Sequence, residues 1–420
     1  MPKPYREVAR CRVCGNRELI PILSLGKQAL TGVFPRTKAK KVPSGPLDLV
    51  KCRETGNHDS CGLVQLKQSY DKKQMYGGGY GYRSGLNRGM VDHLQGLVQT
   101  IMRRIPLSAD DLVVDIGSND STLLRSYRKG PTLVGIDPTA KKFRRFYPPH
   151  IRLIPDFFSA AAFLREFGGK KAAVVTTIAM FYDLDSPMNF MREIGEILAD
   201  DGLWVLEQSY LPSMIDATAY DTICHEHLEY YGLKQIQWMA ERADFKIVDV
   251  VLNDVNGGSF AVTLAKRGSR FRENAALVWR LIANERRAGY AGMEVYRRFK
   301  KRVFQHREAL LAFLKKTRKS GGRIMGYGAS TKGNVILQFC GLTRADVSAI
   351  AEVNEEKYGC WTPGTYIPIV SEREARAAEP DYFLVLPWHF KTGIVAREKK
   401  YLRAGGRLIF PLPTLHVVAS

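Results

Sequence analysis

The chain has 420 residues, of which 45% are hydrophobic, and Lys and Arg outnumber Asp and Glu by 63 to 42, which gives a net charge of +21. This length is enough for about two to four domains, and because no run of about 18 uncharged apolar residues occurs, the composition excludes a membrane-spanning protein. The positive charge attracts anions such as nucleic acids, acidic membranes or phosphorylated metabolites, but it does not indicate which of these is the partner.

The first region, residues 1–68, is predicted to fold around a metal ion. Its first residues are polar and lack the apolar segment of a secretory signal, so we expect a cytoplasmic protein with reduced cysteines. Cys11 and Cys14 form a Cys-x-x-Cys knuckle, and Cys52 and Cys61 complete four thiolates for a tetrahedral zinc ion. The wide spacing of the second pair leaves two alternatives, in which His58 replaces Cys52 or Cys61, or the cysteines are unrelated. Four protein ligands leave no open position, so the zinc would be structural.

The second region, residues 69–267, alternates apolar strand-like runs with helical segments, which is typical of a doubly wound parallel sheet. We therefore predict an α/β fold. The strands are expected at 112–116, 133–137, 173–178 and 202–207, with a closing hairpin formed by 245–251 and 259–265.

The first strand of this region ends in a turn that suits S-adenosylmethionine. The turn has one glycine instead of the Gly-x-Gly-x-x-Gly of pyrophosphate sites, which argues against a nicotinamide cofactor. An acidic residue that ends the second strand can accept ribose hydroxyls, and an Asp-Phe pair after it can face the adenine. The predicted cofactor residues are Asp115, Gly117, Ser118, Asn119, Asp120, Asp137, Asp156 and Phe157. The alternative is an α/β core without a ligand.

Two imidazoles and two carboxylates, those of His225, Glu226, His227 and Glu229, lie close together in the stretch Thr222–Tyr231, which suggests proton transfer beside the cofactor. A histidine titrates near neutral pH and suits the role of a general base. Two alternatives are open. The histidines could be core or surface residues on one strand, or Cys224, His225 and His227 could hold a metal, because alternate strand residues share a face.

The third region, residues 268–420, begins with basic helices between Arg286 and Arg323, which form either a solvated face or an anion-binding surface. A glycine-rich turn follows at Gly326–Asn334. Its backbone N–H groups at a helix N-terminus, together with Lys332, could bind a diphosphate, or the turn could serve tight packing alone. Strands at 349–352, 382–388 and 407–411 would complete a second α/β sheet.

These stretches resemble the S-adenosylmethionine-dependent C-methyltransferases that methylate nucleotide-linked 4-keto-deoxysugars. The resemblance runs through the whole chain, and its matching stretches are Cys11–Cys14, 61–66, Tyr80–Gly85, Asp115–Asp120, Glu207–Tyr210, Cys224–Tyr231, Gly326–Asn334 and Thr362–Thr365. It implies a small N-terminal zinc-binding domain, a central class I methyltransferase domain with a Rossmann-like sheet, and a C-terminal Rossmann-like domain that holds most of the nucleotide sugar.

The resemblance also implies a reaction. The methyl group moves to the carbon beside the 4-ketone, with C3 favoured, after a base removes its proton and the ketone takes the charge as an enolate. His227 would be that base, and Glu226 and His225 would orient it or stabilise the enolate oxygen. Tyr80 or Tyr82 could donate a hydrogen bond to that oxygen. The expected substrate-binding residues are Tyr327, Ser330, Thr331, Lys332, Asn334 and Arg83.

Two departures from the family leave open which group polarises the ketone. Cys224 stands where some members have Tyr, and Phe181-Tyr182 where some have His. One alternative function is O- or N-methylation of a nucleotide sugar or a related anionic metabolite. A remote alternative is a basic zinc-containing nucleic-acid-binding protein, which lacks support because basic and aromatic residues do not alternate. We expect no nucleic-acid or membrane partner, and a monomer or homodimer; the sequence does not specify the nucleotide or the sugar.

Overall fold

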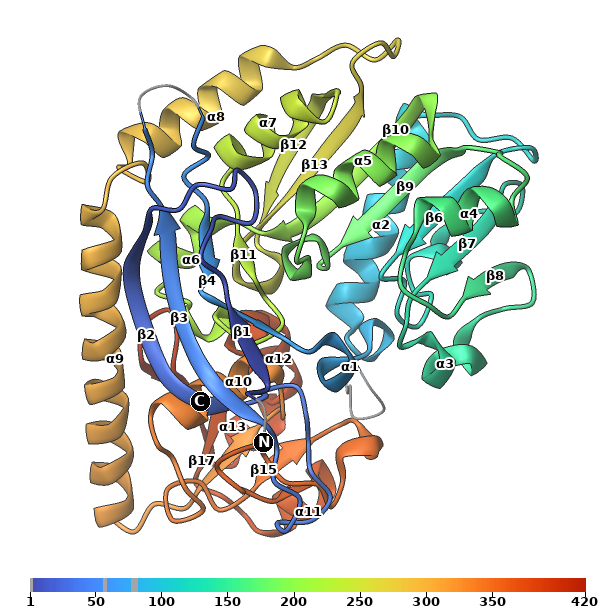
Figure 1. The fold of residues 1–420 in the computed structure, drawn as a ribbon. Coiled ribbons are helices and arrows are strands. Elements are labelled where there is room, and N and C mark those ends of the chain that lie inside the picture. The colour runs from blue at the N-terminus through green and yellow to red at the C-terminus, as the bar shows by residue number, and fades with distance from the viewer. Residues whose placement is uncertain (1–2, 56–58, 77–81) are drawn as a thin grey trace.

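The computed structural model of the protein describes residues 3–55, 59–76 and 82–420, so His58 and Tyr80 lie outside the described residues. Figure 1 shows three parts: the blue N-terminal strands beside the long helix α9 (Glu294–Lys319), a central sheet with green and cyan elements, and an orange and red C-terminal part below them. The predicted α/β fold class is confirmed, because two of the parts are layered sheets with helices.

The central sheet has seven strands in the order β12-β13-β10-β9-β6-β7-β8. Strand β13 runs antiparallel to both neighbours, and the remaining neighbouring pairs are parallel. This is the strand order of a class I methyltransferase sheet. The bounds are β6 (Leu112–Ile116), β7 (Thr132–Ile136), β8 (Ile151–Ile154), β9 (Ala172–Ile178), β10 (Leu198–Ser209), β12 (Phe245–Asn253) and β13 (Ser259–Lys266).

Helices cover both faces of this sheet, which explains why its parallel strands read as continuous apolar runs. On one face lies α2 (Arg88–Arg104), where the Asn87 side chain caps the first turn by accepting from the Met90 N–H. Its buried residues recur every three or four positions and pack on the sheet. The opposite face packs on α4 (Ala160–Glu166), α5 (Pro187–Ile197) and α7 (Leu233–Arg242) around the fully buried Trp204.

The N-terminal part is an antiparallel sheet in the order β11-β4-β3-β2, with a separate pair formed by β1 and β5. Its strand β11 comes from the central region of the sequence and pairs with Val64 and Gln65 of β4. The central region therefore contributes a strand to the N-terminal sheet. The bounds are β1 (Tyr5–Glu7), β2 (Leu19–Ala29), β3 (Ser44–Cys52), β4 (Val64–Leu66), β5 (Gln68–Tyr70), β11 (Glu229–Tyr230) and α1 (Lys72–Met75).

The C-terminal part is a six-stranded sheet in the order β16-β15-β14-β17-β18-β19, parallel except for β19. Its strands are β14 (Ile324–Tyr327), β15 (Ile350–Glu352), β16 (Ile369–Ser371), β17 (Tyr382–Val385), β18 (Arg407–Phe410) and β19 (His416–Val418). Its helices are α10 (Thr331–Phe339), α11 (Glu372–Ala377), α12 (Lys391–Arg397) and α13 (Lys399–Arg403).

The remaining α-helices are α3 (Ala140–Phe143), α6 (Leu211–Asp216) and α8 (Ala275–Arg287). The 3-10 helices are η1 (Ser84–Leu86), η2 (Leu124–Ser126), η3 (Arg144–Phe146), η4 (Phe181–Asp183), η5 (Tyr220–Thr222), η6 (Val255–Gly257), η7 (Glu355–Lys357) and η8 (Trp388–Phe390).

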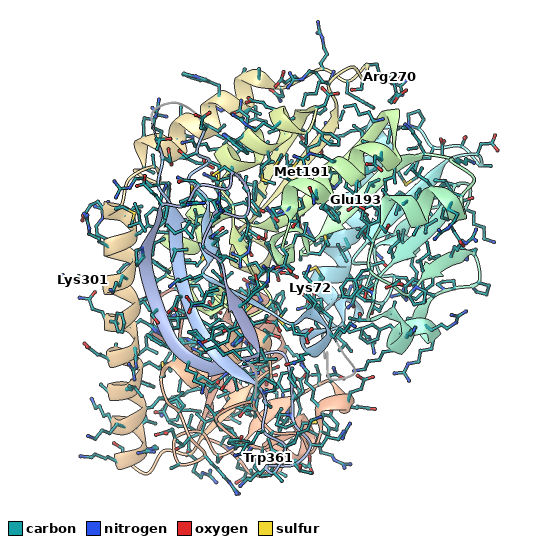
Figure 2. All side chains as sticks on the ribbon, viewed as in Figure 1. Lys72, Met191, Glu193, Arg270, Lys301 and Trp361 are labelled. Atoms are coloured by element: carbon teal, nitrogen blue, oxygen red, sulfur yellow. The ribbon has the colours of Figure 1, made fainter. Side chains whose placement is uncertain are left out.

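The basic helix α9 packs one face against β2 and leaves the other in solvent. Its buried residues, among them Phe299, Val303 and Leu310, recur with helical spacing. Figure 2 shows Lys301 pointing away from the molecule on the outer side of this helix. Within the described part of the chain, every helix is too short or too polar to cross a bilayer.

The strands expected from the sequence are confirmed except in two places. Residues 224–228 lie outside any strand, so the alternative that placed His225 and His227 on one strand is wrong. The strand expected at 382–388 ends at Val385, because Pro387 has no N–H for a ladder and η8 begins at Trp388. The division of the chain at residues 68 and 267 stays a prediction.

Candidate active site

Four cysteine sulfurs converge at the end of the N-terminal sheet. Cys11 and Cys14 come from the knuckle before β2, Cys52 ends β3, and Cys61 precedes β4. Their Sγ atoms all lie within 4.8 Å of one another, with 3.5 Å between Cys11 and Cys61 and 3.6 Å between Cys14 and Cys52. Tetrahedral zinc with bonds of about 2.3 Å needs sulfurs about 3.8 Å apart, so this set fits zinc.

No second metal cluster occurs among residues 3–55, 59–76 and 82–420. The four cysteines are the one group there of three or more Cys, His, Asp or Glu ligand atoms that could hold an ion. The alternative of a metal at Cys224, His225 and His227 is therefore wrong. The alternative with His58 as a ligand concerns a residue outside the described ones.

The zinc knuckle is linked to the central domain through Arg12. Its guanidinium donates to the carbonyls of Leu66 and Gln68, and its Nε lies 3.6 Å from the buried carboxylate of Glu229 in β11. Neither Glu229 oxygen accepts a hydrogen bond from another described residue. A buried carboxylate without hydrogen bonds is costly, so the Arg12 charge is its main compensation.

The predicted cofactor turn after β6 is held by a close approach to Met180 and by hydrogen bonds to Asp137. Gly117 has φ 80°, and a Cβ there would come within 3.0 Å of Met180. Asp137 accepts the Asn119 N–H through Oδ2 and the Thr139 N–H and hydroxyl through Oδ1. Oδ2 therefore keeps acceptor capacity for a ribose hydroxyl.

The other predicted cofactor residues divide between the turn and its rim. Asp115 is buried, accepts from the Thr176 hydroxyl at 2.6 Å, and has its pKa raised by burial to about 7. Ser118 bonds the Tyr147 hydroxyl at 2.7 Å. Asp156 accepts from its neighbour's N–H, and the Phe157 ring is 46% exposed, so this pair lies at the rim.

Arg83 lies at the cofactor turn. Its Nε is 3.3 Å from Asp120, which also accepts the Gly85 N–H at 3.0 Å. The Asn119 side chain donates to the Tyr82 carbonyl, and the Tyr82 ring is largely exposed. The structure thus brings residues 82–85 to the cofactor turn. This position favours a contact of Arg83 with the cofactor over a contact with the sugar.

The two histidines of the Cys224–His227 stretch have different surroundings. His225 is fully buried, and its Nε2 donates to the Gln28 carbonyl while Nδ1 accepts from Thr31. Burial lowers the pKa of His225 to about 3, so its ring is neutral. The residue forms part of the contact between this stretch and the N-terminal sheet. Its ring nitrogens and that of His227 have different hydrogen-bond partners.

His227 is the partly exposed residue of this stretch. Its Nδ1 lies 2.8 Å from the Thr222 carbonyl and must donate to it, which leaves the Nε2 lone pair free. Burial, followed by the charge of Lys332, lowers the pKa of His227 to about 3. The ring packs on Tyr182 and lines a narrow pocket with Tyr182, Ser209, Leu211, Met214, Thr222, Glu229 and Tyr230.

Glu226 sits where all three parts of the protein meet. A Cβ on Gly32 would lie 2.3 Å from Glu226 Oε1 and 3.5 Å from the Thr331 hydroxyl, so the N-terminal loop approaches both closely. The Thr31 hydroxyl donates to Glu226 at 3.4 Å. Burial raises the pKa of Glu226, which favours its neutral form.

Most predicted residues of the Gly326–Asn334 turn are bound within the protein. The Tyr327 hydroxyl donates to Glu398, Ser330 caps α10 by accepting the Gly333 N–H, and the Asn334 amide donates to the Thr31 carbonyl. Their expected role as substrate ligands stays a prediction.

In the same turn, the Thr331 hydroxyl lies close to Gly32, as the Glu226 carboxyl does. Lys332 donates to the Asn256 carbonyl at 3.0 Å. The structure thus brings the first turn of α10 to the Cys224–His227 stretch.

Sequence reasoning missed two features of the site. Thr222 orients His227 through its main chain, which no side-chain pattern reveals. Asp183 is half-buried, and burial raises its pKa well above the usual range. Glu229, the second carboxylate of the 222–231 stretch, is buried, and burial raises its pKa in the same direction. The burial of Glu229 depends on β11 pairing with β4, which is a long-range contact.

Comparison with known proteins defines the class first. Family models match three consecutive parts of the chain: "Putative zinc binding domain" at residues 11–76, "Methyltransferase domain" at 90–250 and "C-methyltransferase C-terminal domain" at 254–413. Together with the sheet order and the cofactor turn, these define an S-adenosylmethionine-dependent methyltransferase with a structural zinc site.

One curated relative then gives the family. The C-methyltransferase NovU of Streptomyces niveus is 30% identical over 424 residues, which cover 99% of this chain and 98% of NovU. The chain belongs to this family of C-methyltransferases, as the sequence motifs indicated.

Solved structures are similar to part of the chain. The plantazolicin methyltransferase BpumL, in complex with a pentazolic desmethylPZN analogue and SAH, is 12% identical, covers 41% of this chain and 83% of its own, and has a TM-score of 0.34. The YcgJ protein from Bacillus subtilis is 13% identical, covers 42% and 99%, and has a TM-score of 0.31.

Removing one zinc ligand should release the metal. Because structural zinc supplies about 10 kcal/mol of folding free energy in small zinc peptides, Cys61→Ser is expected to lose bound zinc and to unfold at a lower temperature. Metal content by mass spectrometry and a thermal melt measure both. Cys360→Ser, a buried cysteine outside the cluster, is the matched control and should keep its zinc. A Cys61→Ser protein with full zinc content would contradict the four-cysteine site.

Proposed function

We propose that this protein transfers the methyl group of S-adenosylmethionine to the carbon beside the ketone, C3, of a nucleotide-linked 4-keto-deoxysugar through an enolate, with His227 as the general base. The observation that carries the proposal is the state of His227. It lines the pocket, and the bond from its Nδ1 to Thr222 leaves Nε2 unprotonated.

The electrostatics of the pocket support proton removal by a neutral imidazole. With a pKa lowered to about 3, His227 carries no proton on Nε2 throughout the physiological pH range. The same burial makes the imidazolium costly, so the proton transfer needs a negative charge formed beside it. The enolate supplies that charge, because the electron pair of the broken C–H bond moves onto the ketone oxygen.

Glu226 suits the stabilisation of that oxygen. Its raised pKa favours the protonated carboxyl, and a protonated carboxyl can donate a hydrogen bond to an oxyanion. His225 has no free ring nitrogen for this purpose, so we assign it the positioning of the loop. Bound S-adenosylmethionine supplies the electrophilic methyl group.

In this proposal, the nucleotide sugar binds between the central and C-terminal parts. The approach of Gly32, Glu226 and Thr331 to one another supports this placement, because the first turn of α10 then borders the residues that handle the proton. The proposal includes a cytoplasmic location and a monomer or homodimer.

Product analysis tests the reaction. The protein is incubated in deuterated water with methyl-labelled S-adenosylmethionine and a panel of nucleotide-linked 4-keto-6-deoxysugars, and NMR locates the methyl group and the deuterium. We expect a carbon-bound methyl beside the ketone, and deuterium at the same carbon of sugar left unmethylated, because enolate formation precedes transfer. A methyl group on oxygen or nitrogen would support the alternative methyltransferase, and no turnover on any sugar would contradict the proposed substrate.

Loss of the base should stop the chemistry without affecting the cofactor. His227→Gln is expected to lower deuterium exchange and methyl transfer by about 10²- to 10⁴-fold, since general-base catalysis contributes about that factor. Calorimetry should show unchanged binding of S-adenosylhomocysteine. His150→Gln, at an exposed position, is the control and should keep wild-type rates. Equal exchange rates in the two variants would exclude His227 as the base.

A further inference from the structure

The short helix η5 carries the carbonyl that orients His227. Its residues Tyr220, Asp221 and Thr222 are all buried, and the Thr222 carbonyl accepts the Nδ1 proton of His227 at 2.8 Å. A neutral histidine carries one ring proton, so this bond selects the tautomer whose Nε2 is free to take a proton. The position of η5 therefore decides the orientation of the imidazole.

The first residue of η5, Tyr220, is bound to the long helix α9. His306 of α9 has its Nε2 at 2.7 Å from the Pro411 carbonyl and must donate to it. Its Nδ1 is then an acceptor, and it receives the proton of the Tyr220 hydroxyl at 3.2 Å. This contact holds the start of η5 against α9 and, through Pro411, against the segment that follows β18.

The second residue of η5, Asp221, is bound to the C-terminal part by a short hydrogen bond. The indole N–H of Trp388 donates to Asp221 Oδ2 at 2.7 Å, and both side chains are buried. Asp221 Oδ1 accepts no hydrogen bond from the described part of the chain. A hydrogen bond is stronger in a buried site than in water, and a buried carboxyl group with few partners depends on each of them. The Trp388 indole thus contributes much of what holds the Asp221 side chain in place.

Trp388 is itself fixed between the C-terminal and central parts. It lies after β17, at the carboxyl end of the C-terminal sheet, where the chain packs on the glycine-rich turn: a Cβ on Gly328 would come within 2.8 Å of Pro387. Its ring also reaches η6 of the central part, since a Cβ on Gly257 would lie 3.2 Å from it. The indole N–H is therefore presented to Asp221 from a fixed position.

We propose that Trp388 is a positioning residue for the general base: its hydrogen bond to Asp221 holds η5, and η5 holds the His227 imidazole in the orientation and tautomer that proton removal needs. This inference rests on the proposed function and adds a residue that acts on the base without touching the reacting atoms of the sugar. The C-terminal part then sets the geometry of the base as well as binding the nucleotide sugar. A displacement of about 1 Å in a catalytic group can cost about 10²-fold in rate, so the loss of this bond should be visible in the chemical step.

The first test removes the indole N–H and keeps an aromatic ring. Deuterium exchange at the sugar carbon is followed in deuterated water without S-adenosylmethionine, as a function of sugar concentration. Trp388→Phe should lower the exchange rate at saturating sugar by about 10- to 10²-fold and leave the concentration for half-maximal exchange unchanged. Trp279→Phe is the matched control and should keep the wild-type rate, because the Trp279 ring is 75% exposed on α8.

A second measurement follows the imidazole itself and needs no substrate. Nitrogen NMR of protein with isotope-labelled histidine distinguishes a proton on Nδ1 from a proton on Nε2, and the signals of His227 are those that His227→Gln lacks. The wild-type protein should carry the proton on Nδ1, where the Thr222 carbonyl accepts it. Trp388→Phe should show both tautomers, because η5 is no longer held. Unchanged His227 signals in Trp388→Phe would overturn the inference.

Variants of Asp221 show whether Trp388 acts through it. Asp221→Ala should exchange about as slowly as Trp388→Phe, and Asp221→Asn should exchange faster than Asp221→Ala, because its amide oxygen can still accept the indole proton. Adding Trp388→Phe to Asp221→Ala should cost little more, since residues that act through one contact are not additive. If Trp388→Phe fails to fold, Trp388→Phe/Asp221→Asn removes the carboxyl group that has lost its partner and should fold but exchange slowly.

Three results separate a failure of the inference from a failure of the proposed function. A wild-type rate at saturation with weaker sugar binding would make Trp388 a substrate-binding residue. Equal losses from Trp388→Phe with and without Asp221→Ala would show that it does not act through Asp221. Absence of exchange by the wild-type protein on every 4-keto sugar would overturn the proposed function, and the tautomer measurement would still decide whether Trp388 positions His227.

Discussion

The turn at residues 224–228 has no regular secondary structure of its own, and the site depends on how the rest of the protein holds it. The Leu66 N–H donates to the Leu228 carbonyl, and the Leu228 N–H donates to the Tyr182 carbonyl. His225 is bound to the Gln28 carbonyl and to Thr31, whose own carbonyl accepts from Asn334 of α10. The N-terminal sheet, the central sheet and the C-terminal part therefore fix one turn together. This arrangement gives His225 and His227 different surroundings although one residue separates them.

The fold was predictable where the signal is local. The run Leu112–Ile116 is apolar, short and followed by a glycine turn, and it is β6. The hairpin of β12 and β13 follows from two apolar runs around an Asn-Gly-Gly turn. Strand β11 was not predictable, because two residues become a strand only by pairing with β4, far away in the sequence. The same holds for the different surroundings of the two histidines. Their spacing suggested a shared strand face, whereas residues 224–228 form no strand and each histidine has its own hydrogen-bond partners.

The glycine-rich turn of the C-terminal part shows a different reason for incomplete prediction. Its residue types suit an anion cradle, and the turn does begin a helix, so the local structure follows from the sequence. The sequence does not show which groups these side chains bind in the folded protein. The Ser330 hydroxyl caps α10, the Tyr327 hydroxyl donates to Glu398, and the Asn334 amide donates to the Thr31 carbonyl. A polar residue is available to a ligand only if the fold leaves it unpaired, and that is decided by contacts both within the C-terminal part and with the N-terminal part.

The zinc-binding region is joined to the pocket of His227 through one side chain. Arg12 lies between two zinc ligands, so a bound metal fixes the main chain from which it projects. Its guanidinium is buried, bound to the carbonyls of Leu66 and Gln68, and opposite Glu229, which borders the pocket of His227. Burial raises the pKa of Glu229 well above its usual range, and the charge of Arg12 opposes that rise. Burying such a pair costs desolvation energy, and apolar residues of the same size would serve stability as well. The contact is therefore better explained by what it joins than by stability, because it ties the zinc knuckle to β11 and to the carboxyl group beside His227.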